Sequence, residues 1–169
     1  MRAPTIAAVF AAAALACAAS AAPAVSRSVP KGWTEDVAAA RRRAADEGKL
    51  VFMSFSGSDW CGYCRMMDAE VFSSEEFVKA ASDKYVLVMI DMPRDRSSLS
   101  ELAAGQNPGL VGKYGVRGFP SMVVTDSAGA VVRRTSGYVK GGPKAFLAEL
   151  GKLMDGVEWP APASGKNAK

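Results

Sequence analysis

Two short apolar runs with helical segments between them restrict the folds open to this chain. LVFMSF at 50–55 and YVLVMID at 85–91 are almost wholly apolar, which is typical of strands buried on both faces of a sheet. Because the intervening residues read as helices, the two strands are expected to pair in parallel. SMVVT at 121–125 and AVVRRT at 130–135 flank Gly129 and predict a hairpin. The pattern predicts an α/β fold with a mixed sheet and helices on both faces.

Capping residues predict where the helices begin and end. The first helix is expected to begin at Thr34, an N-cap residue followed by acidic residues, and to end at Gly48. Ser73 is expected to cap a later helix, with Glu76 completing a capping box. The other expected helices are one starting at the cysteines, one within 107–116 closed by Gly115, and one starting at Gly142-Pro143.

The first 21 residues differ from the rest of the chain. Arg2 is followed by an uncharged, alanine-rich stretch that ends in Ala19-Ser20-Ala21, the layout of a signal peptide for export to the periplasm or another extracytoplasmic compartment. A membrane anchor is the alternative, although the stretch is short and weakly hydrophobic for a span. Cys17 lies in a loose lipoprotein-type sequence with Leu15 two residues before it, so a lipoprotein anchored through Cys17 stays open as well.

The remaining chain divides into a linker at 22–32, one domain at 33–155 and a tail at 156–169 that is expected to be disordered. The formal net charge is +4, and loss of Arg2 with the signal peptide would leave +3. This excess does not indicate nucleic acid as a partner. The basic run at 41–43 falls within a helical pattern and is typical of a solvated face.

Cys61 and Cys64 are separated by two residues and are the cysteines left after signal removal. A structural zinc site needs four Cys or His ligands, and the chain has no histidine, so zinc would require two chains. Arg65 stands where covalent haem attachment needs histidine. A disulfide between cysteines separated by two residues restricts the unfolded chain little, so it would add little to the stability of the fold. A pair at a helix start, beside Arg65, favours a stabilised thiolate and redox chemistry without metal or cofactor.

Two motifs resemble those of the thioredoxin-like family. FSGSDWCGYC at 55–64, after a buried strand, is similar to the thioredoxin active site. NPGLVGKYGVRGFPSMVV at 107–124 resembles the second thioredoxin signature, which carries the cis-proline. The resemblance covers about residues 34–154 and is strongest to exported members with a WCxxC motif. It implies the thioredoxin fold, a central mixed sheet with helices on both faces, and thiol–disulfide exchange.

The resemblance also assigns roles to single residues. Cys61 matches the attacking cysteine, or nucleophile, and Cys64 matches the resolving cysteine. Trp60 matches the tryptophan that flanks the active site. Gly62 and Tyr63 stand between the cysteines, where thioredoxin has Gly-Pro. Because Gly-Tyr occurs in periplasmic disulfide isomerases, strict reductase behaviour is not implied.

Further correspondences concern the second motif and one buried position. Pro120 matches the cis-proline that faces the disulfide, and substrate polypeptide is expected to lie extended beside Phe119 and Pro120. Thioredoxin has a buried Asp that relays protons where this chain has Ser54. A serine cannot titrate in that range, so the relay is absent or uses Asp59 or water. The polar stretch 93–106 resembles an insertion relative to thioredoxin.

The expected function is therefore that of a thiol–disulfide oxidoreductase of the cell envelope. Its implied partners are proteins with disulfides or thiols and a membrane or envelope redox protein that recycles the cysteines. The chain is expected to act as a monomer. The direction of electron flow stays open, and the alternative function is a non-catalytic binding module on the thioredoxin fold. The intact cysteine pair with Trp60 and Pro120 counts against that alternative.

Overall fold

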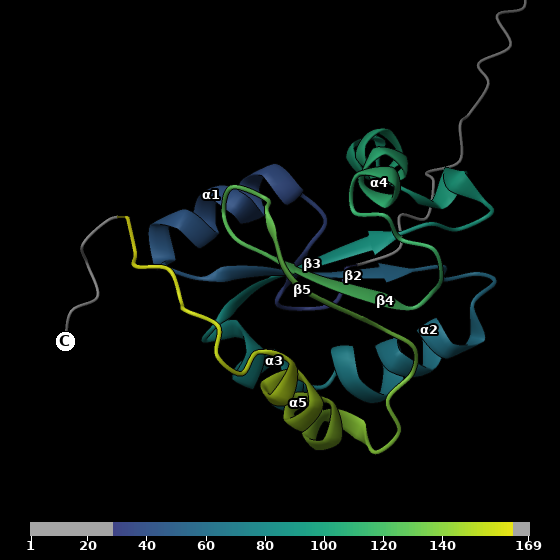
Figure 1. The fold of residues 1–169 in the computed structure, drawn as a ribbon. Helices are drawn as coiled ribbons and strands as arrows, with labels where there is room; N and C mark the ends of the chain where they lie inside the picture. The colour runs from purple at the N-terminus through teal and green to yellow at the C-terminus, as the bar shows by residue number, and fades with distance from the viewer. Residues whose placement is uncertain (1–28, 164–169) are drawn as a thin grey trace, which may run out of the picture.

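A five-stranded sheet carries helices on both faces in the computed structural model, which describes residues 29–163 (Figure 1). In chain order the elements are β1 (Trp33–Thr34), α1 (Val37–Glu47), β2 (Leu50–Ser56), α2 (Gly62–Met67), the π-helical turn η1 (Asp68–Phe72), α3 (Glu75–Ser82), β3 (Tyr85–Asp91), the 3-10 turn η2 (Arg96–Ser98), α4 (Glu101–Lys113), β4 (Ser121–Thr125), β5 (Val131–Ser136) and α5 (Gly142–Leu153). No helix among these residues is long and apolar enough to cross a membrane.

The strands lie in the order β1-β3-β2-β4-β5. β1, β3 and β2 are parallel, whereas β4 is antiparallel to both β2 and β5. β2 lies at the centre of the sheet and all seven of its residues are buried. The predicted mixed sheet, the two buried strands and the hairpin are therefore confirmed.

Side chains alternate across the sheet and form two separate cores. α2, η1, α3 and α5 cover one face, and α1 and α4 cover the other (Figure 1). On β2, Phe52 points into the first core and Met53 into the second. Aromatic rings dominate the first core, where Phe52 packs edge-on against its neighbours. These neighbours are Trp33, Phe72, Phe77, Tyr85 and Phe146.

The first helix begins later than predicted. Thr34 belongs to β1, which pairs with β3, and the N-cap is Asp36, whose carboxylate accepts from the N–H of Ala39 at 2.8 Å. The reason is Trp33, whose ring is buried in the first core and whose Nε1 donates to the Phe72 carbonyl. This anchor holds the chain in the sheet and delays the helix. The predicted end at Gly48 is confirmed, with φ of +65°.

The predicted cap at Ser73 is wrong by one residue. α2 runs directly into η1, where the N–H of Ser73 reaches back five residues to the Asp68 carbonyl at 2.9 Å. This wider turn uses one residue more than an α-helical turn. Ser74 therefore caps α3, and its Oγ accepts from the N–H of Phe77 at 3.2 Å. With Ser74 as the N-cap, the residue three positions later is Phe77, so the expected capping box with Glu76 does not form.

The helix expected within 107–116 is the second half of a longer one. α4 starts at Glu101, and the N-cap Ser100 accepts from the N–H of Ala103. Pro108 lies inside this helix, where a proline removes one backbone hydrogen bond. Part of the expected insertion at 93–106 is therefore helical. Gly115, with φ of +60°, follows the end of α4, as predicted.

The segments outside the domain are only partly described. Val29 packs against the first core, so the end of the expected linker contacts the domain. Residues 157–163 also pack on the domain, because the Trp159 ring lies edge-on to Tyr85 and the N–H of Ala163 donates to the Ala45 carbonyl. The expectation of disorder is wrong for these residues. The expected signal peptide, residues 22–28 and residues 164–169 lie outside the described residues.

Candidate active site

The two cysteines lie where the chain passes from β2 into α2. Cys61 is the N-cap of α2, and its Sγ accepts from the N–H of Cys64 at 3.2 Å. The two residues are joined by a disulfide. Cys61 is 7% exposed and Cys64 is 1% exposed, so both are buried in this oxidised form and Cys61 is the more accessible. The predicted helix start at the cysteines is confirmed.

The loop between β2 and Cys61 is held by hydrogen bonds to the end of β3. The N–H of Ser58 donates to the Asp91 carboxylate at 2.9 Å, and Trp60 Nε1 donates to the Met92 carbonyl at 2.8 Å. Gly57 allows the indole to lie across the loop, since a Cβ at Gly57 would fall 2.3 Å from the Trp60 ring. The position of the tryptophan beside the disulfide is therefore fixed by the chain that follows β3.

Asp59 has a structural role in this loop. Its carboxylate accepts from the N–H groups of Arg94 and Asp95 at 2.9–3.0 Å. These hydrogen bonds hold the pKa of Asp59 below its usual value, and the bond from the N–H of Asp95 has the largest effect. Because this exposed carboxylate is held in its ionised form, it is suited to fixing the loop by accepting hydrogen bonds. It is less suited to passing protons to a buried thiol. These hydrogen bonds hold the start of the 93–106 segment against the active-site loop.

The second motif lies at the same end of the sheet as the cysteines. The Phe119–Pro120 peptide is cis, as expected from the resemblance, and Pro120 is buried. Ser121 pairs with Phe55 on β2, which places Pro120 beside the β2 residue that leads into the cysteine loop. The Phe119 ring lies edge-on to Trp60, with 5.3 Å between ring centroids. This ring contact brings the cis Phe119–Pro120 segment next to Trp60.

A different group of side chains lies on the outer side of α2. Tyr63 is 62% exposed and its ring stacks on Tyr138, with centroids 5.9 Å apart. Tyr138 comes from the loop between β5 and α5, and its hydroxyl donates to the Glu70 carboxylate on η1. Tyr138 was not predicted from the sequence as a site residue. An isolated tyrosine in the glycine-rich stretch SGYVKGG was the signal available for it.

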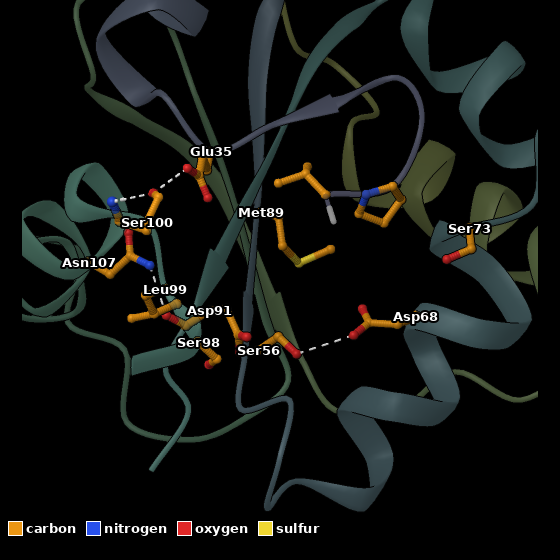
Figure 2. Close-up of a pocket in the computed structure, with 13 residues that line it drawn as sticks. Glu35, Ser56, Asp68, Ser73, Met89, Asp91, Ser98, Leu99, Ser100 and Asn107 are labelled. Carbon is orange, nitrogen blue, oxygen red and sulfur yellow. Dashed lines mark hydrogen bonds between the residues drawn. The ribbon is translucent and has the colours of Figure 1, made fainter. Parts of the chain in front are cut away.

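A cavity of about 190 Å³ lies behind the active-site loop, at the end of β3 (Figure 2). Ser56, at the end of β2, donates to the Asp68 carboxylate at 3.4 Å, and Asn107 Nδ2 donates to the Asp91 carbonyl at 2.8 Å (Figure 2). Asp68 follows Cys64 by four residues, a spacing that places both on one helix face. Asp68 was not predicted from this spacing as a neighbour of the site. Ser54 is buried, and its Oγ has no hydrogen-bond partner among the described residues.

Comparison with known proteins agrees with this geometry. Residues 37–153 match the model of a family described as a thioredoxin-like domain. The chain belongs to the thioredoxin-like family. The curated protein "Disulfide bond reductase DsbH" of Chlamydia pneumoniae is 30% identical over 116 residues, which are 69% of this chain and 69% of that protein.

Solved structures show the same fold. A structure titled "DsbH Oxidoreductase" superposes with a TM-score of 0.66 and 26% identity, covering 79% of this chain and 89% of the other. A disulphide isomerase from Xylella fastidiosa gives a TM-score of 0.54 at 21% identity over 70% of this chain and 88% of its own, which shows the fold alone. With its cysteine pair and these relatives, this thioredoxin-like protein is a thiol–disulfide oxidoreductase.

Proposed function

We propose that the chain exchanges its Cys61–Cys64 pair with the disulfides and thiols of protein substrates, Cys61 attacking and Cys64 resolving. The Cys61–Cys64 disulfide, which directly follows Trp60 in the chain and lies at the same end of the sheet as the Phe119–Pro120 segment, is the observation that carries this proposal. Cys61 is the more exposed of the two residues, so we expect a partner to reach it first. The N–H of Cys64 points at Cys61 Sγ and stabilises the thiolate that the reduced form uses.

The chemistry consists of two exchange steps. In the reduced protein the Cys61 thiolate attacks one sulfur of a substrate disulfide, so a mixed disulfide forms and the other substrate sulfur leaves as a thiolate. Cys64 loses its proton to solvent and attacks Cys61. The Cys61–Cys64 bond forms and the second substrate thiolate leaves. Two electrons pass to the substrate, and the reverse sequence oxidises a dithiol.

In this proposal each neighbouring side chain has a defined task. Trp60 and Phe119 form an apolar wall on one side of the disulfide. The backbone at Phe119 and Pro120 lies at the end of β4, where an extended substrate segment can add its own hydrogen bonds. Gly62 leaves open space at the residue after Cys61, because a Cβ there would meet no described atom within 4 Å. Tyr63, the residue before Cys64, is exposed at the surface of α2.

We further propose that the protein works as a reductase. The support is the relative at 30% identity, which is named a disulfide bond reductase. Insulin reduction by the wild type with dithiothreitol should be faster than with Cys61→Ser or Cys64→Ser. A wild type no faster than Cys61→Ser would contradict catalysis and support the binding-module function instead. Titration of the cysteine pair against glutathione then tests direction, since a pair that stays oxidised in reduced glutathione favours a reductase and an easily reduced pair favours an oxidase.

Export, recycling and oligomeric state are also part of the proposal. Residues 1–21 are proposed to be a signal peptide, and a membrane or envelope redox protein is proposed to reduce the cysteines again. The layout of Arg2, the apolar stretch and Ala19-Ser20-Ala21 supports export. The mass of the protein from an envelope fraction should fit a chain starting at Ala22, and light scattering should give a monomer. A lipid-modified start at Cys17 would identify a lipoprotein, and an intact chain in the cytoplasm would contradict export.

A further inference from the structure

Three of the six large apolar side chains that are exposed among residues 29–163 lie close to the disulfide in the chain. Trp60, Tyr63 and Met66 are 38%, 62% and 39% exposed, although each could contribute to a core. All three fall within seven consecutive residues that include both cysteines. Single exposed apolar residues are ordinary, but a cluster of them at a reactive site indicates contact with another molecule.

Tyr63 and Met66 line an open hollow of about 650 Å³ on the outer face of α2 and η1. The other residues that line it are Gly62, Arg65, Ala69 and Glu70. The residues that line the hollow begin at Gly62, one residue after Cys61. A substrate that is bonded through its sulfur to Cys61 can therefore place a neighbouring residue over this hollow.

Tyr138 holds the Tyr63 side of this hollow in place. Its ring stacks on Tyr63 at an interplanar angle of 26°, and its hydroxyl donates to Glu70. The hydrogen bond to this carboxylate raises the pKa of Tyr138 above its usual value, which keeps the hydroxyl protonated as a donor. Tyr63 is thus held between a hydrogen-bonded ring and the helix, at a position where a lone exposed side chain would sample several rotamers.

The spacing of an extended chain defines what the hollow receives. One residue of extended polypeptide spans about 3.3 Å, so a residue adjacent to the reacting cysteine can reach Tyr63, which is two residues from Cys61 in the chain. An aromatic ring and a thioether favour an aromatic or bulky apolar side chain there.

We propose that Tyr138 is a specificity-determining residue. With Tyr63 it forms a subsite for an aromatic or bulky apolar residue next to the reacting cysteine of a polypeptide substrate. This inference rests on the proposed function, because it concerns the substrates of the same disulfide exchange. Tyr138 acts by fixing Tyr63 and by offering its own ring, and it takes no part in the transfer of electrons.

Two matched peptides test this subsite. Each has one cysteine in a mixed disulfide with thionitrobenzoate, and they differ only in having Phe or Ala next to that cysteine. Attack by Cys61 on the peptide sulfur forms the Cys61–peptide bond and releases coloured thionitrobenzoate, which is followed in the reduced protein. We expect the wild type to prefer the Phe peptide by about fivefold in kcat/KM, from the magnitude of an aromatic pair.

Substitutions then separate specificity from general damage. Tyr138→Ala should bring the ratio of the two rates close to one, whereas Tyr138→Phe, which keeps the ring, should retain most of the preference. Lys140→Ala, an exposed change in the same loop, should leave the ratio as in the wild type. Equal rates on both peptides in the wild type, or an unchanged ratio in Tyr138→Ala, would overturn the inference. If the wild type releases chromophore no faster than Cys61→Ser, the proposed function itself fails.

Discussion

Replacement of Gly57 by alanine tests how the active-site loop positions Trp60. A Cβ at Gly57 would lie 2.3, 2.5 and 2.7 Å from three atoms of the indole, so the ring has to move. Trp60 is exposed on one side and can swing toward solvent, which leaves the backbone in place. The movement breaks the hydrogen bond from Nε1 to the Met92 carbonyl and the edge-on contact with Phe119.

The magnitude follows from these two contacts. A hydrogen bond contributes about 1 kcal/mol net, and an aromatic pair contributes about 0.5–1.5 kcal/mol. Alanine also reduces the conformational freedom of the unfolded chain, which offsets about 0.5 kcal/mol of the loss. Gly57→Ala should therefore lower the free energy of unfolding by about 1–2 kcal/mol. Insulin reduction should slow as well, because the wall beside the disulfide is lost.

Urea unfolding of the oxidised protein measures this loss. The matched control is Gly105→Ala in the middle of α4, where a Cβ would meet no described atom within 4 Å. That change should stabilise the protein by about 0.5–1 kcal/mol, the usual gain of alanine over glycine within a helix. In a Trp60→Ala background Gly57→Ala should cost almost nothing, since the clashing ring is gone. The same cost in both backgrounds would refute the reasoning.

Three further changes test the fold around the site. Asp36→Ala should lower the free energy of unfolding by about 1 kcal/mol in urea, because the N–H of Ala39 loses its acceptor; no loss would contradict Asp36 as the cap. Burial raises the pKa of Tyr85 to about 12, so above pH 10 the unfolded chain loses this proton first and stability should fall between about pH 10 and 12. Tyr85→Phe should lack this part of the alkaline slope, and an identical slope would argue against it. Trp159→Ala should speed protease cleavage within 157–163, and unchanged cleavage would show that the ring contact with Tyr85 does not hold this segment.

Local sequence patterns were sufficient for the features that depend on local chemistry. The buried strands, the hairpin at Gly129 and the end of α1 at Gly48 each follow from residues close together in the chain. The cysteine pair and the Phe119–Pro120 segment were found because both motifs are distinctive. Register then places these two motifs at one end of the sheet, as an α/β fold requires.

Other features depend on contacts between distant residues and could not be predicted in this way. β1 exists because Trp33 finds a buried place against Phe72, which no pattern around Thr34 reveals. The shift of the α3 cap comes from one additional residue in η1, a backbone arrangement without a clear sequence signal. Tyr138 and its acceptor Glu70 are 68 residues apart and share no motif. The packed segment at 157–163 has the composition of a flexible tail. Trp159 is the one residue type in it that indicates packing against the domain.

The most direct test of the account is the capture of a substrate by single cysteine variants. Cys64→Ser, mixed with a peptide disulfide and examined by intact mass, should form a lasting adduct at Cys61, because the resolving thiol is missing. Cys61→Ser should form little adduct, since Cys64 is almost fully buried. Dithiothreitol should release the peptide from Cys64→Ser. An adduct on Cys61→Ser that equals or exceeds the one on Cys64→Ser, or no adduct on either variant, would contradict Cys61 as the attacking cysteine.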